Sequence, residues 1–218
     1  MLRICLIGPG DIELHYFNIL KLDKEKFQRD LEEIARVLAE RFEIVLLPDR
    51  GICFELAKLY KKFGGKKVVG TVPYSDKDFG IGHLKKFMEA EVNGKKLFDE
   101  FIDTTHWYKQ DLTHCLFGDA ILYLGESLGA LGELVYGYYL YKLFVGAKPQ
   151  VKVSLAKIHP AARAGTKIKY STIVYKPFFA GKLSTELEYY IKKFGKLYYV
   201  ENPKQLKLIL NQLLKDIR

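Results

Sequence analysis

Cysteine is scarce in this chain: Cys5, Cys53 and Cys115 are the only thiols among 218 residues. Such an odd, widely spaced set excludes a disulfide framework and a cysteine metal knuckle, and it indicates a reducing compartment. The five histidines carry no stronger signal, since no two have a spacing typical of metal ligands. We therefore expect three buried free thiols, no metal site and no resident cofactor.

Long hydrophobic runs are also missing. The longest candidate, residues 120–131, is interrupted by glycines and by Glu126, so no segment approaches the length of a membrane span. The apolar first residues run directly into Pro9-Gly10-Asp11 with no cleavage site, which argues against a signal peptide. These absences predict a cytoplasmic protein without a membrane partner.

Positive charge exceeds negative charge, with 35 lysines and arginines against 26 acidic residues and a formal net charge of +9. A basic balance favours anionic ligands such as nucleotides. The basic residues are scattered and form no arginine-rich stripe, so a nucleic-acid partner is not expected. A lysine-rich solvated surface is the simpler explanation for much of the excess.

Apolar runs alternate with amphipathic segments along the chain. Apolar runs predict strands at residues 2–7, 43–47, 67–72, 120–124, 149–155, 167–175 and 196–200. Helical spacing predicts helices at residues 27–42, 53–63, 107–116, 130–144 and 185–194 and from 203 onward. Residues 74–104 give no clear element beyond an apolar stretch at 97–102.

This alternation predicts an α/β fold: a Rossmann-like, doubly wound, mainly parallel sheet with helices on both faces. We expect one domain over residues 1–218, with a basic, strand-rich insertion at 151–182. Ligands of such sheets bind outside the carboxyl ends of the strands. The loops that follow predicted strands contain Gly8, Gly10 and Asp11, then Arg50 and Gly51, then residues 125–129. We take these as candidate ligand contacts, with a plain turn or a surface arginine as the simpler alternatives.

The most informative segment is residues 119–133, DAILYLGESLGALGE. A buried strand reaches a glycine-containing turn, and a helix follows at once. Backbone N–H groups at such a turn and the helix amino end together form a seat for phosphate. Gly129 has no side chain to block close approach, and Glu133 lies four residues further along the helix. A carboxylate there repels phosphate, so it suits a ribose hydroxyl or chemistry at the sugar.

The segment resembles the LOG-like, or lysine-decarboxylase-like, family of cytokinin-activating phosphoribohydrolases. That family has Asp-Ala before a strand, followed by a motif of the form PGGxGTxxE. Without a gap, Asp119 and Ala120 match the dipeptide, and Gly129 and Glu133 match the last glycine and the glutamate. The remaining motif positions differ: Gly125 stands for the proline, Glu126 and Ser127 for two glycines, and Ala130 for the threonine.

A second segment supports the resemblance. The family has a helix that begins Gly-Ile-Met-Glu, ends at Gly-Gly and precedes a strand of the type VIGVLP. Here Gly51-Ile52 begins the helix, Gly64-Gly65 ends it, and residues 68–73 read VVGTVP. A weaker similarity to the family covers residues 196–208, where a strand and Glu-Asn-Pro precede the last helix. The family's Arg-Lys pair has only Lys109 as its nearest counterpart.

The resemblance implies a homodimer, for which the helix at residues 130–144 is the candidate interface, and a nucleoside monophosphate-like ligand. It also implies possible hydrolysis of the N-glycosidic bond, with Glu133 as the catalytic residue. The same segment resembles nucleoside deoxyribosyltransferases, in which a helix glutamate attacks the sugar. The altered motif positions favour a third reading, a non-catalytic carrier or sensor of a phosphorylated cofactor. We rank nucleotide binding first and hydrolysis second.

Overall fold

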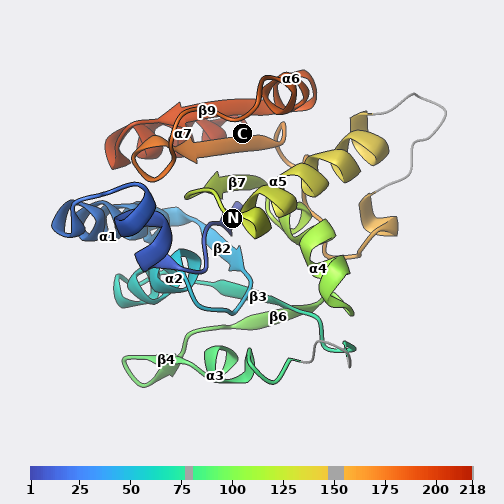
Figure 1. Ribbon diagram of the computed structural model, residues 1–218. Helices are drawn as coiled ribbons and strands as arrows, with labels where there is room; N and C mark the ends of the chain where they lie inside the picture. The colour runs from blue at the N-terminus through green and yellow to red at the C-terminus, as the bar shows by residue number, and fades with distance from the viewer. Residues whose placement is uncertain (77–80, 147–154, 218) are drawn as a thin grey trace.

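The computed structural model describes residues 1–76, 81–146 and 155–217. Its centre is a seven-stranded sheet with the strand order β6-β3-β2-β1-β7-β8-β9 (Figure 1). Every pairing in this sheet is parallel. The strands span Arg3–Ile7 (β1), Glu43–Leu46 (β2), Val68–Val72 (β3), Glu100–Asp103 (β6), Ala120–Tyr123 (β7), Ser171–Tyr175 (β8) and Lys196–Val200 (β9).

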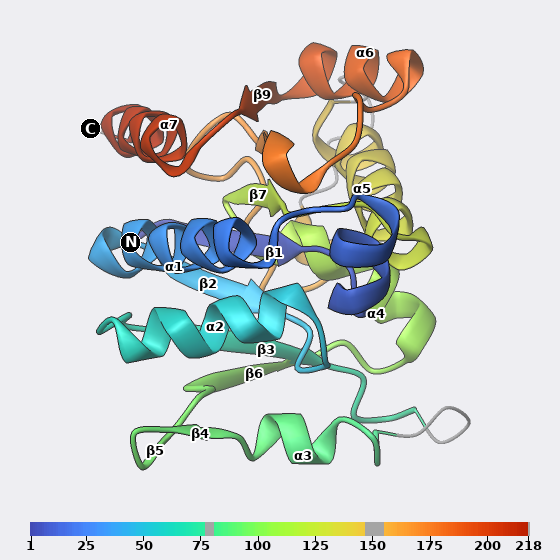
Figure 2. The same ribbon diagram turned by 60° about the vertical axis from the view of Figure 1, so that its left-hand side comes forward.

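Helices cover both faces of the sheet (Figures 1 and 2). One face is covered by α1 (Lys24–Arg41), α2 (Ile52–Lys62) and α7 (Pro203–Lys215), whose apolar sides join one core cluster. The other face is covered by α4 (Trp107–Thr113), α5 (Leu128–Tyr141) and α6 (Thr185–Phe194), and a second cluster lies there. The predicted Rossmann-like, doubly wound α/β fold is therefore confirmed.

Buried strands and capped helices explain why the main elements form where the sequence predicts them. Every residue of β1, β3, β7 and β8 is buried, as expected for parallel strands covered on both faces. Asp23 caps α1 by accepting from the Lys26 N–H, and Asn202 caps α7 ahead of Pro203. Side-chain caps and proline at the first helical position are common helix starts.

The structure corrects several predicted segments. Residues 74–104, which showed no clear element, contain the edge strand β6, a short helix α3 (Lys85–Met88) and a hairpin of β4 (Glu91–Val92) and β5 (Lys95–Lys96). A π-helical segment, η1 (Glu13–Ile19), was not predicted either. The strand predicted at 167–175 begins only at Ser171, after a turn in which the Thr166 N–H donates to the Arg163 carbonyl.

The region at 151–182 holds a central strand, because β8 lies between β7 and β9 in the main sheet. Of the strand predicted at 149–155, residues 149–154 lie outside the described residues, and Leu155 begins a short 3₁₀ turn (Leu155–Lys157). No helix in the described ranges is both long and apolar enough to cross a bilayer.

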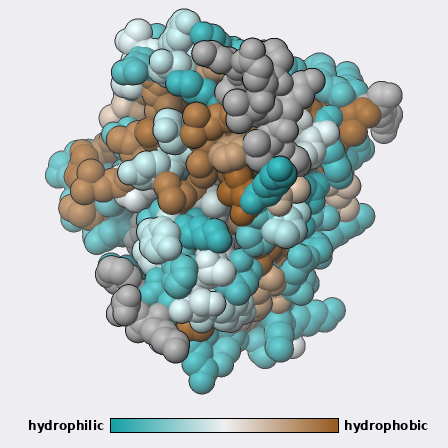
Figure 3. All heavy atoms as spheres, turned by 90° about the vertical axis from the view of Figure 1, so that its right-hand side faces the viewer, coloured by the Kyte–Doolittle hydropathy of each residue, from teal (hydrophilic) through white to brown (hydrophobic). Residues whose placement is uncertain are grey.

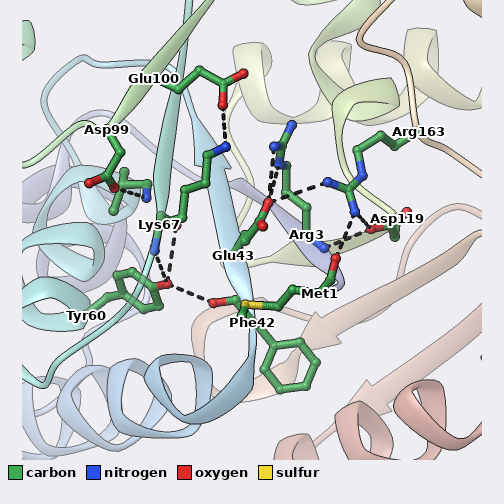
Figure 4. A network of polar contacts seen from close by, with 11 residues as sticks. Met1, Arg3, Phe42, Glu43, Tyr60, Lys67, Asp99, Glu100, Asp119 and Arg163 are labelled. Carbon is green, nitrogen blue, oxygen red and sulfur yellow. Dashed lines mark hydrogen bonds and ion pairs between the residues drawn. The ribbon is translucent and has the colours of Figure 1, made fainter.

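A charged network joins the amino ends of the strands (Figure 4). The Asp119 carboxylate is fully buried, and its Oδ2 accepts from the Arg3 backbone N–H at 2.8 Å and from Arg163 Nη2 at 2.6 Å. Glu43 bridges the two arginines at 3.1 Å and 3.5 Å. Asp119 therefore anchors the segment after α5 to the sheet, at the end opposite the ligand loops.

A second polar network is buried beneath α4. The ring of His114 lies between the Leu6 carbonyl, 3.1 Å from Nε2, and Thr71 Oγ1, 3.1 Å from Nδ1. Gln110 Nε2 also approaches Nδ1 at 3.3 Å. The carbonyl accepts only, so Nε2 carries the proton in the neutral ring. Burial lowers the pKa of His114 to about 4.

This network predicts a specific loss of stability in acid. The unfolded chain binds a proton at His114 near pH 6.5, whereas the folded chain does so only near pH 4. Protons therefore favour the unfolded state across that window. We expect the stability advantage of the wild type over His114→Asn to shrink by about 3 kcal/mol between pH 7 and pH 4. Urea unfolding of both proteins at each pH measures it, and a constant advantage would contradict the buried neutral ring.

Candidate functional site

Strands β1, β2, β3 and β6 are added to the sheet in one direction, and β7, β8 and β9 in the other. The direction reverses between β1 and β7, which are hydrogen-bonded neighbours. Two of the predicted ligand loops meet at this reversal. Gly125 has φ +148°, and a Cβ there would lie 2.7 Å from Tyr16 Oη and 3.1 Å from Pro9 Cδ. The Tyr16 hydroxyl donates to the Leu124 carbonyl at 2.7 Å. The fold thus brings together the loops after β1 and β7 at the position where doubly wound sheets bind ligands.

The third predicted loop, after β2, packs against the first. Gly51 has φ +114°, and a Cβ there would lie 2.4 Å from the Pro9 carbonyl oxygen, which accepts the Ile52 N–H at 3.1 Å. A Cβ on Gly8 would lie 2.5 Å from Ile52 Cγ2. Close packing therefore explains both glycines without a ligand. Arg50 is exposed and has no ion pair with another described residue.

Open backbone donors gather at the two loops that meet. Ser127 is the amino-terminal cap of α5, and its hydroxyl accepts from the Ala130 N–H at 3.2 Å. Gly129 is exposed, and a Cβ there would meet no atom within 4 Å. Within the described ranges, the following loop residues donate no backbone hydrogen bond: Gly10, Asp11, Gly125, Glu126 and Ser127. Gly125 is buried, whereas the other four lie at the surface. The loops that hold these donors and the amino end of α5 form a region suited to an anion; we call it the anion seat.

The other predicted contacts divide between structural and exposed positions. Asp11 Oδ1 accepts from the Leu14 N–H at 2.9 Å and so begins η1. Glu126 is exposed beside the seat, whereas Ala130 is buried in the core. Lys109 is half-buried on α4, where its carbonyl accepts from the Thr113 hydroxyl. Of these residues, only Glu126 has a free side chain at the seat.

A cavity of about 330 Å³ opens beside the anion seat. It lies between η1, the turn after β7 and the segment after β8, and its walls are mostly apolar. Its lining includes Pro9, His15, Leu20, Glu126, Ser127 and Phe178. Glu133 is not part of that lining. The seat therefore separates an apolar cavity on one side of α5 from Glu133 on the other.

Glu133 lies on the second turn of α5 and is half-buried. Burial raises the pKa of its carboxyl well above the usual value, and the negative charge of Asp111 raises it further. Burial also raises the pKa of Asp111, on α4, to about 6. Neither carboxylate has a hydrogen bond or an ion pair with a described residue. No sequence pattern indicates the electrostatic coupling of Asp111 to Glu133, because the two residues share no motif and are related only by the packing of α4 on α5.

The cysteines behave as small buried groups. All three thiols are free; Cys5 and Cys115 are buried and Cys53 is half-buried. Burial raises the pKa of each thiol, and the charge of Glu133 adds to the rise. Nucleophilic thiolates need a lowered pKa, so none of them is suited to covalent catalysis. No group of three potential metal-ligating side chains occurs in the part of the chain that the structure describes.

The outward face of α5 is apolar. Exposed side chains run along it and into the turn that follows: Leu128, Val135, Tyr136, Tyr139, Leu143 and Val145. Figure 3 shows hydrophobic residues gathered in a band across the corresponding side of the molecule. Contiguous apolar surface of this kind is typical of an interface. The homodimer implied by the resemblance therefore stays a prediction, with this face as its candidate contact.

No family model and no curated protein matches the sequence. Several solved structures do match its shape. The molybdenum cofactor binding protein from Rippkaea orientalis is 12% identical, with a TM-score of 0.55 over 98% of this chain and 97% of its own. The molybdenum cofactor carrier protein of Chlamydomonas reinhardtii is 12% identical, with a TM-score of 0.55 over 98% of both chains. The structural genomics target TM1055 is 13% identical, with a TM-score of 0.58 over 97% of this chain and 99% of its own. At such identities the likeness establishes the fold, and this chain shares the Rossmann-like α/β fold of all three.

Proposed function

We propose that this protein binds a nucleotide-like ligand, with its phosphate at the anion seat. The observation that carries the proposal is the set of open backbone donors on two adjacent loops, next to the amino end of α5. Aligned N–H groups and the helix dipole stabilise a phosphate without a charged side chain. The net charge of +9 adds a long-range attraction for anions.

The carboxyls of Asp111 on α4 and Glu133 on α5 support a position for the sugar and base of the ligand. Glu133 follows Gly129 by four residues, and an α-helix rises about 1.5 Å per residue. The Glu133 Cα is therefore about 6 Å further along the helix than that of Gly129. A phosphate at that level would be repelled by the Asp111 carboxylate. A sugar or base with hydroxyl or N–H donors suits that level better.

Hydrolysis of the N-glycosidic bond is the activity that this arrangement supports best. The raised pKa favours the protonated form of Glu133, and a protonated carboxyl can give a proton to the departing base. That state suits an acid better than the nucleophile of the deoxyribosyltransferase alternative, which must be ionised. Glu133 would then protonate the base as the N-glycosidic bond breaks, while the anion seat holds the phosphate.

A carrier without turnover is the second candidate. Glu126 adds a negative charge beside the seat, and Ala130 is buried and lacks a hydroxyl. Both features weaken a phosphate site relative to the glycines and threonine of the LOG-like motif. The names of two structural neighbours, a molybdenum cofactor binding protein and a molybdenum cofactor carrier protein, fit this alternative.

A charge introduced at the seat tests the phosphate-binding proposal. Gly129→Asp adds a carboxylate where a side chain has open space, so the fold should tolerate it. We expect the affinity for AMP to fall by about tenfold or more, the scale of one charge-assisted hydrogen bond. Titration calorimetry measures the affinity, and thermal unfolding checks the fold.

Gly129→Asn is the matched control, because it adds the same bulk without the charge. A much larger loss for the aspartate variant than for the asparagine variant supports phosphate at the seat. Equal affinities in both variants and the wild type would mean that the phosphate lies elsewhere.

A further inference from the structure

The cavity of about 330 Å³ lies beside the anion seat, on the side of α5 away from Glu133. Glu126 and Ser127 belong both to the seat and to the cavity lining. Leu128 and Leu131, three residues apart on one side of α5, also line the cavity, whereas Glu133 lies on a different side of the helix. A ligand whose phosphate lies at the seat can therefore extend in two directions, toward Glu133 and into the cavity.

The cavity presents a mostly apolar surface. The rings of Tyr16 and Phe178 line it with their centres 5.4 Å apart, and the Tyr16 hydroxyl already donates to the Leu124 carbonyl. Two further lining residues are open to solvent, since Leu128 is 94% exposed and Ile19 is 60% exposed. Exposed apolar side chains beside a hollow are typical of a ligand site. An aromatic or aliphatic group of a ligand would cover both side chains.

The loops at the anion seat are acidic, although the whole chain has a net charge of +9. The loops after β1, β2 and β7 (residues 8–11, 47–51 and 124–127) contain one basic residue and three acids: Arg50 against Asp11, Asp49 and Glu126. A phosphate monoester carries about two negative charges at pH 7, because its second pKa is about 6, whereas a diester carries about one. Like charges repel, so these loops favour a phosphodiester over a monoester.

We infer that the ligand is a phosphodiester of a nucleoside, with its phosphate at the anion seat and an apolar or aromatic second ester group in the cavity. The inference rests on the proposed function and adds the class of phosphate ester to it. A monoester such as AMP occupies the seat but leaves the cavity empty, and it brings a second negative charge close to Glu126. A diester places one ester group on each side of the phosphate and carries the smaller charge.

Calorimetric titration with three adenosine ligands tests the inference: AMP, its methyl ester adenosine 5′-(methyl phosphate), and its phenyl ester adenosine 5′-(phenyl phosphate). The methyl ester lowers the charge of the phosphate, and the phenyl ester also adds a ring that can enter the cavity. We expect the methyl ester to bind at least as tightly as AMP. The phenyl ester should bind about tenfold or more tightly than the methyl ester, because its ring leaves water for an apolar surface.

Three variants locate these differences, and thermal unfolding checks the fold of each. Ala180 lines the cavity at an exposed position, so Ala180→Trp fills the cavity without entering the core. It should remove most of the advantage of the phenyl ester and leave the affinity for the methyl ester unchanged. Glu126→Gln should strengthen the binding of AMP more than that of the methyl ester, because the monoester carries the larger charge. Glu186→Gln, at an exposed position on α6, removes a negative charge elsewhere and should alter neither difference.

The outcomes separate the inference from the proposal beneath it. If AMP binds and the phenyl ester is no tighter than the methyl ester, the cavity has another occupant, such as a second copy of the chain, and the inference alone is overturned. AMP binding more tightly than both esters would likewise overturn it. An advantage of the phenyl ester that persists in Ala180→Trp would place the ring outside the cavity and contradict the inference. If none of the three ligands binds, the proposed function itself is wrong, and the inference falls with it.

Discussion

Replacing Glu133 with glutamine is expected to lower the release of free base from AMP by about 10²–10⁴-fold, the usual contribution of a positioned acid or base. The same change should raise the midpoint of thermal unfolding at pH 7. Ionising a half-buried carboxyl opposite Asp111 is unfavourable in the folded state, which is why the pKa of Glu133 is raised. Glutamine keeps the shape and removes that cost.

The sign of the stability change depends on pH. A carboxyl with a raised folded pKa stabilises the fold below its unfolded pKa, and the stabilisation is lost as the pH rises through the folded value. The gain from Glu133→Gln should therefore be present at pH 7 and vanish near pH 4. Parallel measurement of base release and thermal unfolding, with Glu186→Gln as the control, tests both parts. Unchanged turnover would show that Glu133 has no catalytic role. A loss of stability at pH 7 would contradict the unfavourable burial of its carboxylate.

Arg163→Ala is expected to lower the free energy of unfolding by about 3–5 kcal/mol, the range for removing one partner of a buried ion pair. Arg163 Nη2 lies 2.6 Å from Asp119 Oδ2, and Asp119 is fully buried. Without the guanidinium, the carboxylate keeps only the Arg3 backbone N–H as a donor. Urea unfolding at pH 7 measures the change.

The double variant Arg163→Ala with Asp119→Asn separates charge from packing. We expect it to recover a substantial part of the stability, because the buried negative charge is gone. A loss below about 1 kcal/mol for Arg163→Ala alone would put the pair in the range of exposed ion pairs and contradict its structural role. No recovery in the double variant would instead assign the loss to packing of the arginine stem.

The sequence predicts the central fold well because buried parallel strands are continuous apolar runs in the sequence. Strands β1, β2, β3, β7 and β9 and most of the helices lie where the pattern indicates them. Strand β6 was missed because its sequence EFID carries an acid at each end, which is compatible with an edge strand but not with a recognisable run. The π-helical segment η1 contains Tyr16, whose hydroxyl donates to the Leu124 carbonyl after β7, a contact that no local pattern encodes.

The candidate site was only partly predictable. The strand–turn–helix pattern located the loops after β1 and β7 and the helix that carries Glu133, since each depends on local sequence. The roles of Gly8 and Gly51 depend on the distance between two loops, which the sequence does not contain. Asp111 was overlooked for the same reason, because its relation to Glu133 arises from the packing of two helices.

The most direct test of the account is an amide NMR titration of the protein with AMP. Ligand at the anion seat should shift the amide signals of Gly10, Gly125, Ser127 and Gly129 first, with smaller effects elsewhere. Ribose 5-phosphate should shift the same signals, because the phosphate determines the contact. A second cavity of about 540 Å³ is lined by residues of α1 and α2 such as Gln28 and Lys58. If AMP instead shifts the amide signals of those residues, the anion seat between β1 and β7 is not the ligand site.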